Sequence, residues 1–401
     1  MKPRFEKRWL ILAGLFLVRT SMGFQYQTVG PLASLLVPDL AIDYARIGAL
    51  IGLYDLPGIA LSLPGALLGK RFGDKRVALA ALGFMTLGGL IMSIGASYPQ
   101  VAFGRLLSGI GGSTLTVLLT KMTVDWFSGR EIVVAIASLL SSWPLGISLA
   151  LMSLGPVATA SSWRAGMLLA ALFCAFGMAL LAVVYHAPPG TPDGTTAARK
   201  RLNLSRGTLG LVLLCAFMWG LINVGLSSLL NFTPDFLISV GYSGILAGAL
   251  VSLITWVMIP SLILGGYLAE RLHRPNLMMS ACFILIGLGM FLLPVVPAPT
   301  LIFIGIGLLF GPLGGLSMAM PARVLSPENR SAGMGIFYTC STAISAFLPV
   351  AAGYSRDITH NPAAPLIFGG ALFVLCVANL WLFNFFQRRW AGPVVKSLVE
   401  N

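Results

Sequence analysis

Three charged side chains lie deep inside long apolar stretches, and they are the residues best suited to chemistry: Arg19, Asp55 and Arg105. A charge at the centre of a bilayer costs about 2.5 kcal/mol or more, so it normally faces a bundle interior or a water-filled path. Arg19 would offer a planar, permanently charged fork of donors to an anionic or carbonyl-rich solute. The alternative is an internal ion pair with Asp55 that only locks two helices together.

The other two deep charges also have two interpretations each. Asp55 precedes Pro57 in the second apolar run, where an irregular main chain is tolerated beside a cavity. It could carry a coupling proton, form a permanent ion pair or contact the solute. Arg105 could instead hydrogen-bond to the main chain and stabilise close helix packing at Gly109 and Gly111.

The second half of the chain supplies polar and aromatic residues within its apolar runs, without a deep charge. Amides and hydroxyls in such runs join helices together as often as they bind a solute. Aromatic residues inside the runs, away from the interfacial belts, are candidates for a cavity lining, although core packing is the simpler interpretation for each one. We predict a solute site lined by Arg19, Tyr26, Tyr54, Asn223, Trp256 and Tyr338.

The elements that must position these residues are membrane-spanning helices. The 401 residues are 57% hydrophobic and 10% charged, whereas soluble domains carry about 25% charged residues. Apolar runs of roughly 20 residues match the hydrocarbon core of a bilayer. We predict an all-α membrane protein with twelve spans, at about 9–36, 46–69, 77–96, 100–122, 132–155, 163–186, 207–235, 243–268, 276–295, 299–321, 331–354 and 363–387.

Basic residues concentrate on one side of this predicted topology. Of 26 Lys and Arg residues, 21 lie in the terminal segments and alternate loops, and the opposite loops hold only Arg46, Arg164 and Arg356. Cytoplasmic loops carry such an excess, so both termini are predicted to be cytoplasmic in a multi-pass protein of a bacterial inner membrane. The net charge of +13 follows from this topology, and we expect the lipid bilayer as partner and no nucleic acid.

A Pro-, Gly- and Thr-rich stretch divides the predicted spans six and six. We predict an N-terminal bundle over 1–186, a linker over 187–206 and a C-terminal bundle over 207–401. A weak repeat relates the two halves, since the loop 66–73 after the second span matches 266–273 after the eighth. Parallel repeats are typical of transporters that bind solute at the repeat interface near the midplane.

The loop after the eighth span, where Gly266 is followed by Glu270 and Arg271, resembles the loop motif of the major facilitator superfamily. The first copy departs from that motif, since Lys70 stands at the acidic position. The resemblance implies two six-helix pseudo-symmetric halves and a cytoplasmic gate at these loops. The gate residues expected from it are Arg71, Asp74, Glu270 and Arg271.

Arg105, Gly109 and Gly111 resemble the fourth-helix motif of the same superfamily, which implies a role for Arg105 in coupling. More loosely, the chain is similar to the cyanate and nitrate/nitrite porter-like members through the segments 125–130 and 320–323. Such porters are expected to carry arginines on the second and eighth helices, and this sequence has none there. The looser resemblance therefore supplies no site.

We expect a secondary transporter that moves a small organic or inorganic anion by alternating access, with a proton as a candidate co-substrate. The alternative is proton-driven efflux of multiple drugs, with Asp55 as proton carrier. The sequence has no deep His, paired carboxylates or metal-ligand spacing, its five Cys are isolated, and no nucleotide-binding GxxxxGK[ST] loop occurs. We therefore expect no enzyme activity, cofactor or metal, and a monomer.

Overall fold

The computed structural model describes residues 2–61, 68–69, 71–127, 131–188, 205–272, 274–326 and 329–390, and these contain helices and no strand. The first part of the chain forms α1 (Lys2–Tyr26), η1 (Gly30–Leu32), α2 (Ala33–Leu40), α3 (Tyr44–Asp55), α4 (Gly58–Leu61), α6 (Asp74–Ser93), α7 (Tyr98–Trp126), α8 (Ile132–Ala160) and α9 (Trp163–Val184). The second part forms α10 (Arg206–Ser239), α11 (Gly244–Leu272), α12 (Pro275–Leu292), α13 (Thr300–Val324), α14 (Arg330–Phe347), α15 (Pro349–Thr359) and α16 (Ala364–Trp390).

The predicted all-α membrane architecture is confirmed. Within the described residues, ten helices are long and apolar enough to cross a membrane. The first predicted span, 9–36, is not one continuous helix, since α1 ends at Tyr26 and the single-turn η1 precedes α2. The second is divided between α3 and α4, beside Pro57. Pro31 lies in η1 and Pro57 lies between α3 and α4; proline lacks the N–H that continues a helix, which favours a break at these two positions.

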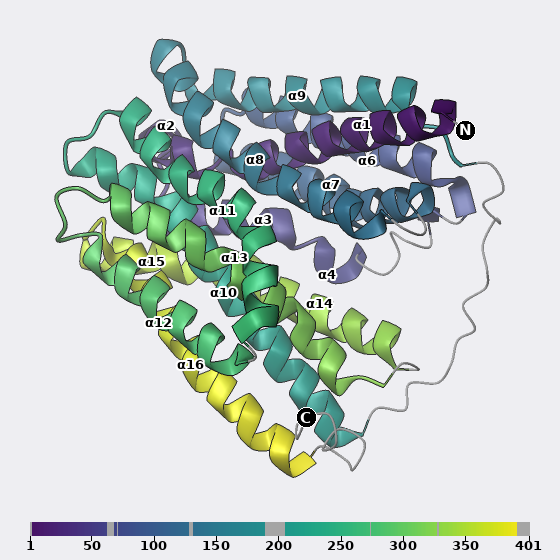
Figure 1. Ribbon diagram of the computed structural model, residues 1–401. Helices are drawn as coiled ribbons and strands as arrows, with labels where there is room; N and C mark the ends of the chain where they lie inside the picture. The colour runs from purple at the N-terminus through teal and green to yellow at the C-terminus, as the bar shows by residue number, and fades with distance from the viewer. Residues whose placement is uncertain are drawn as a thin grey trace.

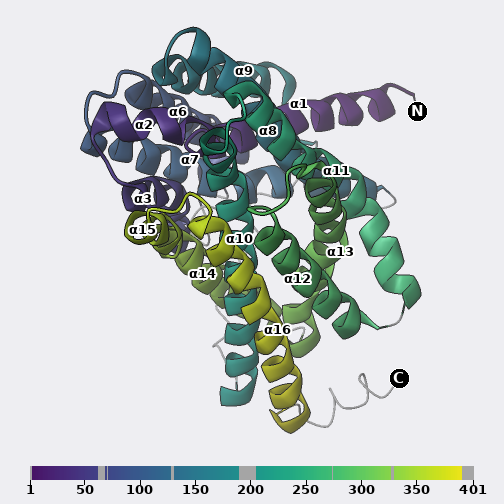
Figure 2. The ribbon, with the colours of Figure 1, turned by 90° about the vertical axis from the view of Figure 1, so that its left-hand side faces the viewer.

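The helices form two bundles that pack mainly within themselves. In the first, α1 packs on α8 and α9, and α6 packs on α7 and α9; in the second, α11 packs on α13, and α10 packs on α14 and α16. Figures 1 and 2 show the bundle that ends with α9 beside the one that begins with α10. Most of the linker, 189–204, lies outside the described residues, so the predicted domain bounds stay a prediction.

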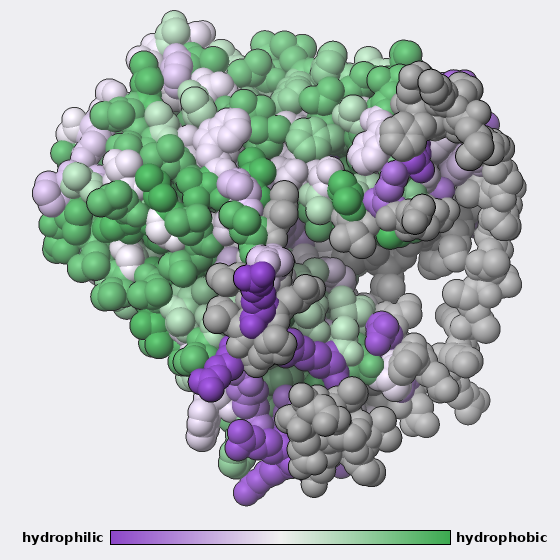
Figure 3. All heavy atoms as spheres, in the orientation of Figure 1, coloured by the Kyte–Doolittle hydropathy of each residue, from purple (hydrophilic) through white to green (hydrophobic). Residues whose placement is uncertain are grey.

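The two bundles meet at the end of the molecule away from the termini. There α3 lies against α15 and α14, η1 and α2 lie against α10, and α8 lies against α11. The α3 contact is main chain against main chain, because a Cβ on Gly48 would lie 2.2 Å from the Pro349 carbonyl oxygen, and one on Gly52 would lie 1.9 Å from that of Ala346. Toward the side where Figure 1 marks the N-terminus, the surface is deeply hollowed between the bundles (Figure 3).

Candidate functional site

Arg19 lies on α1 with 8% of its surface exposed, and its Nε and Nη1 have no hydrogen-bond partner among the described residues. Its electrostatic neighbour is Tyr338 on α14, so this residue of the first bundle faces the second. The structure does not contain the ion pair with Asp55 that the sequence left open, because no salt bridge among the described residues includes either residue. Arg19 is thus a buried cation with free donors.

Asp55 is the last residue of α3, just before the break at Pro57, and it is half-buried. Its electrostatic neighbours are Arg105, Tyr26 and Tyr54. Within the described part of the chain its carboxylate forms neither a salt bridge nor a hydrogen bond. The carboxylate is therefore positioned beside Tyr26, Tyr54 and Arg105, but not beside Arg19, without being neutralised by direct contact among the described residues.

Arg105 is fully buried on α7 and makes the main-chain contacts of the structural interpretation. Its Nη1 donates to the carbonyl of Gln25 at 2.8 Å, its Nη2 to that of Tyr26 at 2.6 Å, and its Nε to that of Leu50 at 3.0 Å. The last carbonyls of a helix have no partner within it, and α1 ends at Tyr26. Arg105 therefore satisfies the carbonyl end of α1 and joins it to α3.

An aromatic cluster surrounds this junction. The Tyr26 ring centroid lies 5.2 Å from that of Tyr54 and 5.2 Å from that of Trp143, and the Arg105 guanidinium lies 4.7 Å from the Tyr54 ring. The Tyr26 hydroxyl interacts with Ser227 of α10, so the cluster reaches the second bundle. The predicted site set did not include Trp143; its position inside a span, beside Pro144, was the available signal.

The predicted residues of the second bundle do not all gather here. Tyr338 is 39% exposed and faces Arg19. Asn223 donates to the carbonyl of Trp219 in its own helix at 2.7 Å. Trp256 is 37% exposed and directs its Nε1 to the Met152 sulfur on α8 at 3.3 Å. The contacts recorded for Asn223 and Trp256 therefore do not join them to the Tyr26 cluster.

The predicted gate residues lie at the termini end of the molecule. Asp74 begins α6 and forms a salt bridge with Lys121 of α7, and Lys121 also lies 3.7 Å from Asp125. The guanidinium of Arg71 lies 5.3 Å from the Phe72 ring, and that of Arg271 lies 4.8 Å from the ring of Tyr267. The Glu270 side chain lies outside the described residues. The salt bridge between Asp74 and Lys121, which lies within one bundle, was not predicted from the sequence.

A polar contact at the opposite end, also missed from sequence, joins the bundles. Asp357 of α15 accepts the main-chain N–H groups of Tyr44 at 3.0 Å and Ala45 at 2.7 Å, which begin α3. Arg356 forms a salt bridge with Asp235 of α10, and its guanidinium lies 3.6 Å from the Tyr44 ring. The sequence shows Asp235, Arg356 and Asp357 as charges near helix ends, but it does not indicate which groups they contact.

Further hydrogen bonds cross between the bundles near this end. The Gln27 amide, just after α1, donates to the Leu230 carbonyl at 2.9 Å. The hydroxyls of Ser148 on α8 and Thr255 on α11 lie 2.7 Å apart. The two bundles are therefore in contact at one end of the molecule, and the surface is hollowed between them at the other (Figure 3), an arrangement typical of transporters that bind a solute between two repeats. Among the described residues no cluster of His, Cys, Asp or Glu could hold a metal ion.

Comparison with known proteins agrees with this arrangement. The chain is 26% identical over 381 residues to the uncharacterized transporter YycB of Bacillus subtilis, covering 91% of this chain and 90% of that protein. It is 20% identical to the hexuronate transporter of Bacillus subtilis, covering 90% of each.

A solved structure with the same fold is a bacterial homolog of the human lysosomal transporter Spinster, in an inward-facing and unoccupied conformation. The TM-score is 0.75 at 16% identity, with 98% of this chain and 100% of that chain covered. The predicted superfamily resemblance is confirmed by the sequence itself, because residues 15–324 match the Major Facilitator Superfamily. With two helical bundles around a buried polar site, this chain belongs to the major facilitator superfamily and is a transporter rather than an enzyme.

Proposed function

We propose that the chain moves a small organic or inorganic anion across the cytoplasmic membrane, with Arg19 as the main anion contact. The observation that carries this proposal is the buried guanidinium, which within the described ranges has two unpartnered donors and no counter-ion. An unpaired buried charge is costly, and an anionic solute between the bundles would offset that cost while satisfying the free N–H groups. Hexuronate, the solute named for one relative, is an anion of this kind.

The proposed mechanism is alternating access, because the contacts between the two bundles are concentrated at one end of the molecule. With both termini in the cytoplasm, as the basic loops predict, the present conformation is open to the cytoplasm and sealed on the outer side. The conformation named for the Spinster homolog supports this orientation. The proposed protein is a monomer of a bacterial inner membrane, with the loops of Arg71, Asp74, Glu270 and Arg271 acting at the cytoplasmic gate. The looser similarity to cyanate and nitrate/nitrite porters adds inorganic anions to the candidates.

Thermal stabilisation of the purified protein tests the proposal. The panel contains a hexuronate, an aromatic carboxylate, nitrate and cyanate on one side and tetraphenylphosphonium on the other. We expect at least one anion to raise the unfolding temperature of the wild type and to lose this effect in Arg19→Gln. The matched control is Arg389→Gln, which removes a cation from the exposed end of α16 and should retain the anion effect.

Proton-driven efflux of multiple drugs is the second candidate. It is favoured by the Tyr26, Tyr54 and Trp143 cluster, whose ring faces could hold a lipophilic cation, and by the unpaired Asp55. The same panel separates the two functions. Stabilisation by tetraphenylphosphonium alone, unchanged in Arg19→Gln, would overturn anion transport and favour efflux.

A further inference from the structure

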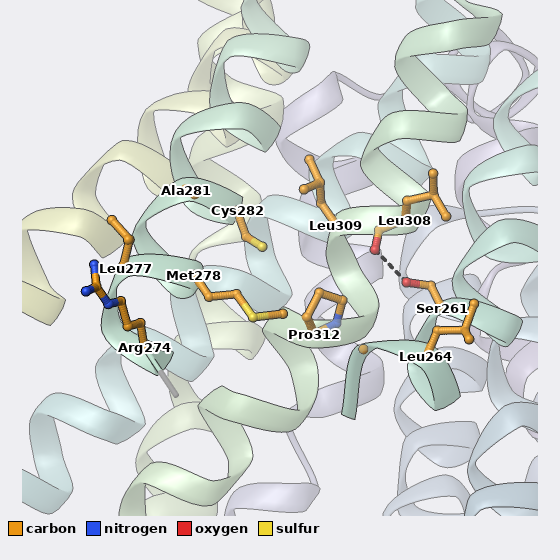
Figure 4. A pocket seen from close by; sticks show the side chains of 11 residues that line it. Ser261, Leu264, Arg274, Leu277, Met278, Ala281, Cys282, Leu308, Leu309 and Pro312 are labelled. Atoms are coloured by element: carbon orange, nitrogen blue, oxygen red, sulfur yellow. Dashed lines mark hydrogen bonds between the residues drawn. The ribbon is translucent and has the colours of Figure 1, made fainter. Parts of the chain in front are cut away.

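A groove of about 500 Å³ lies between α11, α12 and α13 of the second bundle, separate from the Arg19 site. In Figure 4, Arg274 and Leu277 lie on one side of it, Ser261 and Leu264 lie on the other, and Met278 points toward Pro312 between them. The lining is almost entirely apolar. An apolar lining of this kind suits a hydrocarbon chain.

The groove opens on the outer surface of the bundle. Leu264 and Leu277 are each 62% exposed, and Leu308 is 50% exposed. On helices that cross a membrane, leucines with this exposure meet the acyl chains of lipids rather than water. A molecule already in the bilayer can therefore reach the groove without passing through the site between the bundles.

The polar groups at the floor of the groove are hydrogen-bonded to each other within the protein. Pro312 lacks an N–H, so the carbonyl of Leu308, one turn earlier on α13, loses its helical partner. The Ser261 hydroxyl of α11 donates to this carbonyl. The two helices are close enough for this contact because Gly265 faces Pro312, where a Cβ would lie 2.3 Å from the proline nitrogen. The polar side chain left at the groove is Arg274.

Arg274 is exposed, immediately precedes α12 and belongs to no salt bridge within the described ranges. The 18 residues of α12 rise about 27 Å, close to the thickness of the hydrocarbon core. The guanidinium therefore lies at the level of the lipid headgroups. Arginine is well matched to a phosphate, to which it can donate two parallel hydrogen bonds.

We propose that this groove binds an anionic phospholipid, with an acyl chain along Leu277 and Met278 and the phosphate on Arg274. A net negative headgroup complements the unpaired cation, whereas the ammonium of phosphatidylethanolamine would compete with it for the phosphate. This lipid site is independent of the solute, since none of its residues belongs to the Arg19 site. It depends only on the protein being embedded in a bilayer.

Lipid retention by the purified full-length protein, measured by native mass spectrometry, tests the charged part of the site. Phosphatidylglycerol and phosphatidylethanolamine of the same chain length are the probes. We expect Arg274→Gln to weaken phosphatidylglycerol retention about fivefold, the effect of one basic residue near an anionic surface, and to leave phosphatidylethanolamine unchanged. Arg388→Gln, near the end of α16 and not among the residues that line the groove, is the matched control and should change neither.

A second pair of variants tests the apolar part. Leu277→Ser, at an exposed groove position, should weaken retention of both lipids, whereas Leu285→Ser, 50% exposed on the same helix but outside the groove, should not. Added glycerol 3-phosphate should fail to displace the lipid, because it has no acyl chain. Equal retention of the two lipids by the wild type, equal losses in Arg274→Gln and Arg388→Gln, equal losses in the two leucine variants, or displacement by glycerol 3-phosphate would each overturn the proposal.

Discussion

The carboxylate of Asp357 accepts the main-chain N–H of Tyr44 at 3.0 Å from across the boundary between the two bundles. It also accepts the next N–H of the chain, that of Ala45. The first N–H groups of a helix have no partner within it, so α15 completes the beginning of α3. The start of this helix is therefore satisfied by the other bundle only while that end of the molecule is closed.

Asp357→Ala should loosen the closed end. Loss of a helix cap costs about 1 kcal/mol, and here the cost falls on the closed conformation. Spin labels at Ser161, on the exposed turn after α8, and at Ser239, the exposed last residue of α10, should show a longer distance component in double electron–electron resonance. Asp43→Ala is the control, because Asp43 caps the same helix from within its own bundle. A similar lengthening in both variants would show that capping alone, rather than the contact between bundles, is responsible.

Gly52→Ala should act on the same end by a steric route. A Cβ at this position would lie 1.9 Å from the Ala346 carbonyl oxygen, so α3 and α14 cannot keep their present separation. We expect fewer molecules with the short distance between the two labels and slower solute exchange. Gly83→Ala on α6 is the control, because its Cβ would meet nothing within 4 Å. An unchanged distance distribution in Gly52→Ala would contradict the close main-chain contact.

Arg105→Lys should destabilise the whole first bundle. Lysine cannot reproduce the fork that serves three carbonyl groups, and each unsatisfied buried group costs about 1–3 kcal/mol. We expect a lower unfolding temperature and less folded protein after size-exclusion chromatography. Arg19→Gln provides the contrast, because Arg19 has free donors and no salt bridge, so its folded yield should match the wild type. Equal losses in the two variants would argue against a special structural role for Arg105.

Asp55→Asn should separate coupling from solute exchange. If Asp55 carries the coupling proton, the amide cannot, and accumulation driven by a pH gradient in proteoliposomes should be abolished while counterflow persists. The transported solute is the anion that stabilises the purified protein. Glu131→Gln, which removes a carboxylate paired with Arg8, should keep both activities. Gradient-driven uptake by Asp55→Asn at the wild-type rate would exclude Asp55 as the proton site.

Asp39 gives a pH dependence outside the spans. Hydrogen bonds from Trp163 and Arg164, each 2.9 Å long, hold the pKa of Asp39 below its usual 3.8. A lowered pKa means that the ionised form stabilises the fold above pH 3.8 and that this contribution disappears as pH falls through the lowered value. Asp39→Asn should therefore unfold at a lower temperature than the wild type at pH 7, and the difference should vanish in acid. A difference independent of pH would indicate that charge is not its cause.

The fold could be predicted because its determinants are local. The length of the apolar runs specifies membrane spans, and a deep charge such as Arg19 is visible against an apolar background. The sequence left alternatives open where spatial register decides the outcome. The sequence cannot say whether Arg19 meets Asp55, since that depends on how α1 and α3 rotate about their axes. Likewise, Arg105 finds its carbonyl partners because α1 stops at Tyr26, ten residues before the predicted end of that span.

The contacts at the closed end carry a consequence for the diversity of such transporters. Asp357 binds the main chain of α3, and Gly48 and Gly52 bring main chain against main chain. Few of these contacts depend on which larger side chains α3 carries on its other faces. Residues proposed to line the solute site, such as Tyr54 and Asp55 at the end of this helix, can therefore change through evolution while these closing contacts remain intact. In α3, the residues proposed to contact the solute are thus distinct from those that hold the two bundles together.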